Sequence, residues 1–84
     1  MMFDDLKAEP KVLNVLGSVP PEVERCLTRA FNEISRGQLP LTPAGRQNLY
    51  LAFACDYVFV VSVTPGLRLA VVLELYYEAH EESV

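Results

Sequence analysis

Residues 57–63 are the most constraining stretch of this sequence, because they read Tyr-Val-Phe-Val-Val-Ser-Val. All but Ser62 are β-branched or aromatic, the residue types that favour extended strands. Successive side chains of a strand point to opposite faces of a sheet, so a strand that is apolar on both faces needs cover on both. The segment therefore predicts the central strand of a sheet, ended by a turn at Thr64-Pro65-Gly66.

Two further strands are predicted beside the central one. Residues 67–77 carry an apolar residue at every odd position, which predicts that the odd side chains of this strand face the core. Residues 49–54 supply a strand before the central one, although Thr42-Pro43 is also a fair helix start and leaves a helix over 43–55 as an alternative. The three segments, at about 49–54, 57–63 and 67–77, predict an antiparallel sheet.

One main amphipathic helix is predicted over residues 21–36. Pro20 and Pro21 suit the first helical turn, where backbone amides have no helical partner, and Gly37 follows as a stop. Apolar residues recur at steps of three and four and so share one face: Val23, Leu27, Ala30, Phe31 and Ile34. With a short N-terminal strand over 11–16, the chain is expected to be a single α+β domain spanning 1–84, with 1–10 and 81–84 frayed.

The length and composition of the chain indicate a folded protein outside the membrane. It has 84 residues, of which 51% are hydrophobic and 21% charged, which excludes an intrinsically disordered chain. The start, Met1-Met2-Phe3-Asp4-Asp5, lacks the basic region of a signal peptide. The apolar run 49–63 is interrupted by Asp56 and is shorter than the ~20 residues of a membrane span. We therefore expect a cytoplasmic protein.

The reactive side chains of the sequence do not form a known catalytic or metal-binding pattern. Cys26 and Cys55 have 28 residues between them, which fits neither a paired metal-ligand spacing nor a dense disulfide framework. Their apolar neighbours predict buried free thiols, in keeping with a reducing cytoplasm. There is one histidine, His80, and no glycine-rich phosphate loop. We predict no catalytic residue, no cofactor and no metal site.

The charge of the chain disfavours nucleic acid as a direct partner. Its formal net charge is −4, whereas binding to phosphates requires concentrated positive charge. After Gly37 the only cations are Arg46 and Arg68. The carboxylates after Gly37 are Asp56, Glu74, Glu78, Glu81 and Glu82. We expect a protein partner with a basic surface, for which the last four of these acids are candidate contacts.

The order of the predicted elements resembles that of the small toxins of the RelE/ParE superfamily, over residues 11–80. The likeness is carried by Val19-Pro20-Pro21-Glu22-Val23 at the start of the helix, by Leu49-Tyr50-Leu51-Ala52-Phe53 before Asp56-Tyr57-Val58-Phe59-Val60, and by a final strand that reaches Tyr76-Tyr77 and His80. The resemblance implies the small α+β fold of these toxins.

The resemblance also implies what a catalytic member would need. RelE-like ribosome-dependent endonucleases hold RNA with several Lys and Arg on the sheet while the 2′-hydroxyl attacks the scissile phosphate, which requires concentrated positive charge. Here only Arg68, Tyr76 or Tyr77, and His80 match such a set, as phosphate binder, aromatic stacker and terminal acid or base. The basic catalytic set is missing, and ParE-type relatives act by binding a topoisomerase. We therefore expect a non-catalytic protein–protein interaction module, with Arg68, Tyr76 and His80 among its candidate contacts.

Two other functions remain as alternatives. A small acidic inhibitor of a nucleic-acid-handling complex, of the anti-CRISPR-like or nucleic-acid-mimic kind that phages encode, would place the same glutamates in a basic groove. The other alternative is a ribosome-dependent mRNA endonuclease with unusual catalytic residues. Because 51% hydrophobic residues exceed what one helix and a small sheet can hide, we also expect self-association, with a homodimer as its form.

Overall fold

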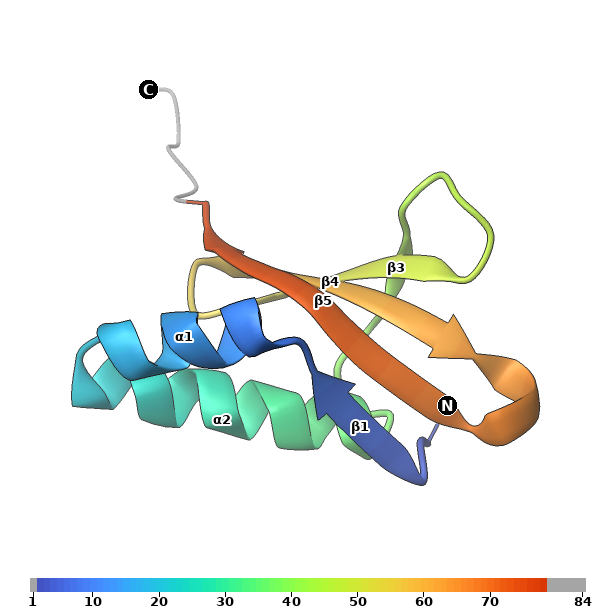
Figure 1. The fold of residues 1–84 in the computed structure, drawn as a ribbon, viewed down its shortest axis with the longest axis horizontal. Helices are drawn as coiled ribbons and strands as arrows, with labels where there is room; N and C mark the ends of the chain where they lie inside the picture. Colours follow the sequence, from blue (N-terminus) through green and yellow to red (C-terminus); the bar gives the residue numbers. More distant parts are fainter. Residues whose placement is uncertain (1, 79–84) are drawn as a thin grey trace.

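The computed structural model describes residues 2–78 and places two α-helices on one face of a five-stranded sheet (Figure 1). The elements are β1 (Asp5–Ala8), α1 (Pro10–Ser18), α2 (Pro21–Ser35), β2 (Thr42–Pro43), β3 (Leu49–Ala54), β4 (Tyr57–Thr64), the 3₁₀ turn η1 (Pro65–Leu67) and β5 (Leu69–Tyr77). The strand order is β1-β5-β4-β3-β2, with β1 parallel to β5 and every other pair antiparallel. The predicted α+β class is confirmed.

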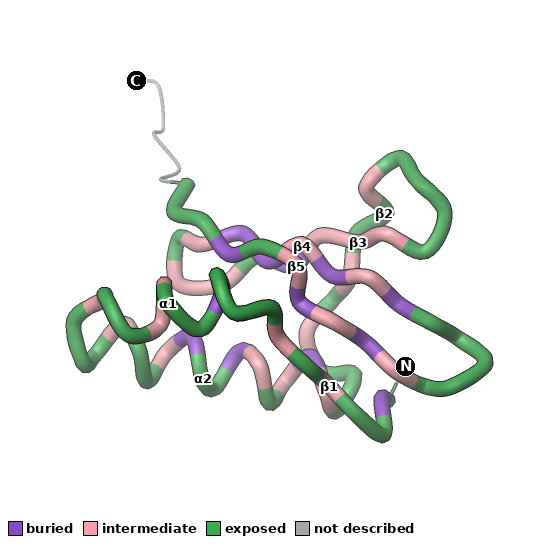
Figure 2. Tube along the Cα trace, in the orientation of Figure 1, coloured by how far each residue is buried: buried purple, intermediate pink, exposed green. Residues whose placement is uncertain are grey.

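Strand β4 lies in the middle of the sheet, as its composition predicted. It pairs with β3 on one side and β5 on the other. Its side chains Phe59, Val61 and Val63 belong to the buried core cluster between sheet and helices. Buried positions recur on α1, α2, β4 and β5, so the core lies between these two layers (Figure 2).

Helix α2 confirms the main predicted helix. Glu22 and Glu24 lie in its first turn, where carboxylates interact favourably with the positive end of the helix dipole. Leu27 and Ile34 are fully buried against the sheet, and Phe31 is partly buried with its ring edge-on to Phe59 at a centroid distance of 5.3 Å. The helix ends as predicted, because Gly37 adopts a left-handed φ of 72°.

The N-terminal part of the chain differs from the prediction. Residues 11–16 belong to helix α1, and the N-terminal strand is β1, within the segment expected to fray. Pro10 opens α1, and Val12, Val15 and Leu16 recur at helical spacing against the core. Strand β1 forms because β5 offers it a free edge to pair with, from Asp5 opposite Leu69 onward.

Strand β5 contains a β-bulge that the sequence pattern did not reveal. Leu73 has no partner on β4, so the side chains that point to the core are at even positions before Leu73 and at odd positions after it. Ala70 and Val72 are buried in the core before the bulge, and Leu75 is buried after it. The prediction that all odd positions face the core is therefore wrong for residues 67–73.

The segment between α2 and β4 is extended rather than helical, so the alternative helix over 43–55 is wrong. The short strand β2 lies at the edge of the sheet, where Pro43 is tolerated because an edge strand needs fewer ladder hydrogen bonds. Strand β3 then joins β4 through two residues, Cys55 and Asp56, both in the left-handed region with φ of 58° and 65°. This is the geometry of a type I′ hairpin turn.

The two cysteines are bonded, which overturns the prediction of free thiols. Cys26 of α2 and Cys55 of the β3–β4 turn form a disulfide with a Cα–Cα distance of 6.3 Å. The spacing of 29 positions gave no hint of this, because only the packing of α2 under β3 brings the helix beside the hairpin turn. Both residues are partly exposed.

We predict that Phe59→Ala lowers the free energy of unfolding by about 3–5 kcal/mol, because the ring is fully buried and its removal leaves a cavity. Phe31→Ala should cost less, about 2 kcal/mol, because its ring keeps part of its surface in water. Urea denaturation of both variants measures the two losses. Equal losses would show that the Phe59 site collapses around the missing ring.

The hairpin turn gives a second prediction. Asp56→Gly should raise the free energy of unfolding by up to about 1 kcal/mol, because glycine favours the second position of a type I′ turn. Asp56→Ala should lower it by about 1 kcal/mol, since an L-residue without a hydrogen-bonding side chain is strained in the left-handed region. Thermal melts of the two variants should therefore move in opposite directions. A shift in the same direction would contradict the assigned turn.

Candidate protein-binding surface

The face of the sheet opposite the helices is apolar and, among residues 2–78, no helix covers it (Figure 1). Alternate residues of β3, β4 and β5 point away from the core and pair across the strands. We call the nine residues in three paired rows the open sheet face: Phe53–Val58–Tyr76, Leu51–Val60–Glu74 and Leu49–Ser62–Val71. All are apolar or aromatic except Ser62 and Glu74, an unusual composition for a surface that faces water.

The row nearest the hairpin turn carries the two aromatic side chains of the open sheet face. Phe53 is 52% exposed and Tyr76 44%, and both lie beside Val58, which is only 2% exposed. Both rings keep much of their surface in water beside a valine that is almost fully buried. Large, rigid aromatic side chains around an apolar centre are typical of protein interfaces.

Next to this row the open sheet face is hollowed. An open depression of about 430 Å³ is lined by Leu49, Val60, Leu73 and Glu74 together with Glu9 and Lys11. Leu73 joins this surface because the bulge turns it away from the core side. The carboxylate of Glu74 lies 3.1 Å from the Lys11 Nζ atom. The one charge of the open sheet face is thus paired at its rim, while Leu49, Val60 and Leu73 give the depression an apolar side.

The structure separates the candidate contacts predicted from the sequence. Glu74 and Tyr76 lie on the open sheet face, and Glu78 follows β5, where its amide donates a hydrogen bond to the Asp56 carbonyl at 2.9 Å. Arg68 precedes β5, so it lies about 26 Å along the strand from Tyr76. His80, Glu81 and Glu82 lie outside the described residues.

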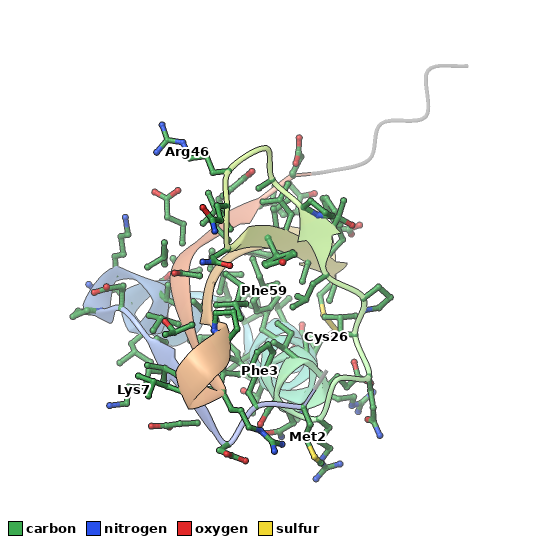
Figure 3. The ribbon with its side chains drawn as sticks, turned by 90° about the vertical axis from the view of Figure 1, so that its right-hand side faces the viewer. Met2, Phe3, Lys7, Cys26, Arg46 and Phe59 are labelled. Carbon is green, nitrogen blue, oxygen red and sulfur yellow. A yellow bond between two sulfur atoms is a disulfide. The ribbon has the colours of Figure 1, made fainter. Side chains whose placement is uncertain are left out.

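Arg68 makes contacts inside the molecule. Its guanidinium lies 3.4 Å from the Asp4 carboxylate and donates a hydrogen bond of 3.4 Å to the Met2 carbonyl. Its own carbonyl accepts a hydrogen bond from the Asp4 amide. These contacts fasten the chain start to the β4–β5 turn. Arg46 is exposed on the loop before β3 and points away from the body of the protein (Figure 3).

Sequence reasoning missed the three β3 residues of the open sheet face, Leu49, Leu51 and Phe53. A signal was available, because both the odd-numbered and the even-numbered residues of 49–54 are apolar, so both faces of this strand need cover. The one helix predicted from the sequence can cover only one face. Residues 2–78 bring no three His, Cys, Asp or Glu side chains together in a way that could hold a metal ion. Neither helix of this part of the chain has the length and apolar character needed to span a membrane.

Comparison with known proteins places this geometry among toxin structures. No family model matches the sequence, and no curated protein matches it. One chain of the toxin–antitoxin complex RelBE2 from Mycobacterium tuberculosis is similar in structure. The TM-score is 0.77 at 18% identity, and the match covers 94% of this chain and 95% of that chain.

Two further solved structures show the same likeness. The archaeal RelE–RelB complex from Pyrococcus horikoshii has a TM-score of 0.71 at 20% identity, covering 96% of this chain and 100% of that one. The isolated RelE toxin of E. coli has a TM-score of 0.72 at 14% identity, covering 98% and 89%. The chain therefore has a RelE-like toxin fold, as the resemblance of its sequence implied.

Proposed function

We propose that this protein is a non-catalytic interaction module with a RelE-like fold that holds a protein partner on its open sheet face. The observation that carries the proposal is the chemistry of this face. Seven of its nine residues are apolar or aromatic, and its one carboxylate, Glu74, is paired with Lys11. Apolar surface of this kind is stabilised by burial against another protein.

The charges of the described residues support a protein rather than RNA as the partner. An RNA backbone requires cations that are free to neutralise phosphates. Lys11 at the rim of the face is paired with Glu74, Arg68 with Asp4 and Lys7 with Asp5. The other four cations lie outside the open sheet face, on α2, at its end and on the loop before β3: Arg25, Arg29, Arg36 and Arg46. Cleavage of RNA would also need cations at the reacting phosphate, and the open sheet face has none among its nine residues.

The expected partner is an antitoxin-like protein that contributes an amphipathic segment. Two of the similar structures are complexes of a toxin with an antitoxin. The apolar rows would receive the apolar side of such a segment. Glu78, which follows β5, favours Lys or Arg on the segment's flank, whereas Glu74 is already paired with Lys11. The proposed compartment is the cytoplasm. When no partner is bound, a second copy of the chain is the available apolar cover, which makes a homodimer.

We predict that Phe53→Asp abolishes this self-association, because it puts an unpaired charge into a contact that excludes water. Leu67→Asp is the matched control, since Leu67 is even more exposed, at 70%, but lies in η1 outside the open sheet face. Sedimentation equilibrium should give a dimer for the wild type and Leu67→Asp, and a 9.4 kDa monomer for Phe53→Asp. A dimer that survives Phe53→Asp would contradict the proposed interface.

Catalysis is tested separately. The purified protein should leave mRNA uncut on translating ribosomes, because the open sheet face has no cation to stabilise the transition state. Primer-extension mapping of the mRNA would detect cleavage, with an active RelE toxin as the positive control. Ribosome-dependent cuts by this protein would overturn the non-catalytic assignment and restore the endonuclease alternative.

A further inference from the structure

The disulfide between Cys26 and Cys55 joins the helical layer to one end of the sheet. It links α2 to the tip of the β3–β4 hairpin, and its sulfur atoms are seen beside Cys26 in Figure 3. The chain has two cysteines, so this bond is its single possible intramolecular disulfide. The fully buried core cluster contains neither residue. The bond is therefore an addition to a core that is complete without it.

The backbone at Cys55 indicates that this residue is there for its sulfur. Its φ of 58° lies in the left-handed region, which favours Gly or Asn in the first position of a type I′ turn. A non-glycine residue held in that region carries a conformational cost, and such cost often accompanies a functional constraint. A structural turn alone would favour Asn-Gly over Cys-Asp. The side chain that justifies the cost is the thiol that reaches Cys26.

The same hairpin tip carries the first row of the open sheet face. Ala54 pairs with Tyr57 beside the turn, and Phe53 pairs with Val58 one position further along. Phe53 and Val58 belong to the open sheet face, while Cys55 packs toward the core side. The disulfide thus ties the end of strands β3 and β4 to the helical layer. The opposite side of the same strands presents Phe53 and Val58 on the open sheet face.

We propose that the Cys26–Cys55 bond is a reducible tie that sets the rigidity of the hairpin tip, and with it the binding competence of the open sheet face. Disulfides in a reducing compartment are usually transient or redox-sensing. Both cysteines are partly exposed, so a dithiol reductant can reach the bond. The effect on partner binding rests on the proposed function, whereas the change in the hairpin does not.

The chemistry is thiol–disulfide exchange with a dithiol, either a small molecule or a protein. A thiolate of the reductant attacks one sulfur, and the other leaves as a thiolate that takes up a proton. The second thiol of the reductant then resolves the mixed disulfide. Two electrons pass to the protein, which ends with two thiols, and the reductant ends as a disulfide. Once the tie is broken, the tip is held by its ladder hydrogen bonds and by the bond from the Glu78 amide to the Asp56 carbonyl.

Hydrogen exchange followed by mass spectrometry tests the tie without any partner. Oxidised wild type, wild type in dithiothreitol and Cys26→Ser are compared under native conditions. We expect peptides covering 50–59 to exchange at least tenfold faster in the reduced wild type, while peptides covering 69–72 keep their rates. Cys26→Ser should match the reduced protein and ignore dithiothreitol. The proposal is overturned if dithiothreitol reduces the bond only in denaturant. It is also overturned if the exchange rate of 50–59 does not change on reduction, or if exchange rates rise equally across the chain.

Self-association supplies the second readout. The dimer of oxidised wild type should dissociate at a concentration at least tenfold lower than the dimer in dithiothreitol, because a pre-organised surface binds with less loss of freedom. Phe53→Asp separates the two ideas: if it leaves the dimer intact, the proposed interface fails while the exchange result still judges the tie. If it abolishes the dimer but dithiothreitol has no effect on the wild-type dimer, the redox control of binding fails and the interface stands.

Discussion

The packing of α2 against β4 is the contact on which the rest of the structure depends. Phe59 lies at the centre of the molecule, fully buried (Figure 3), and the partly buried ring of Phe31 contacts it in an edge-on arrangement. Leu27 and Ile34 complete the helix side of this layer. Because the core is a single cluster, the strands on either side of β4 and helix α1 are all placed relative to this contact.

The same packing leaves one sheet face without a helical cover. Both described helices follow one another at the start of the chain and lie on the same side, so the apolar residues on the other side of β3, β4 and β5 have no helix of residues 2–78 against them. A sheet that is apolar on both faces needs cover on both, and here the helices cover one. This uncovered apolar face is the observation on which the proposed protein partner rests.

Three ion pairs join charges within the described part of the chain. Arg68 fastens the chain start through Asp4 and Met2, and Lys11 pairs with Glu74 at the rim of the open sheet face. These pairs are exposed and contribute little stability each. Their larger consequence is functional, since a cation already paired with a carboxylate is a poor phosphate ligand. The proposed function therefore rests on the surface chemistry of this chain and not on its RelE-like fold, because a fold does not determine the site built on it.

Local sequence by itself determined the elements whose own composition leaves no choice. Strand β4 is apolar at nearly every position, and α2 has a proline start, one apolar face and a glycine stop, so strand and helix were predictable without knowledge of their neighbours. Tertiary structure decided the rest. Strand β1 exists because β5 has a free edge, the bulge at Leu73 depends on the register with β4, and the disulfide depends on α2 lying under the hairpin. The open sheet face belongs to this second group. Both the odd-numbered and the even-numbered residues of β3 and β4 are mostly apolar, so the sequence does not say which set faces the core. The side on which the helices pack decides this.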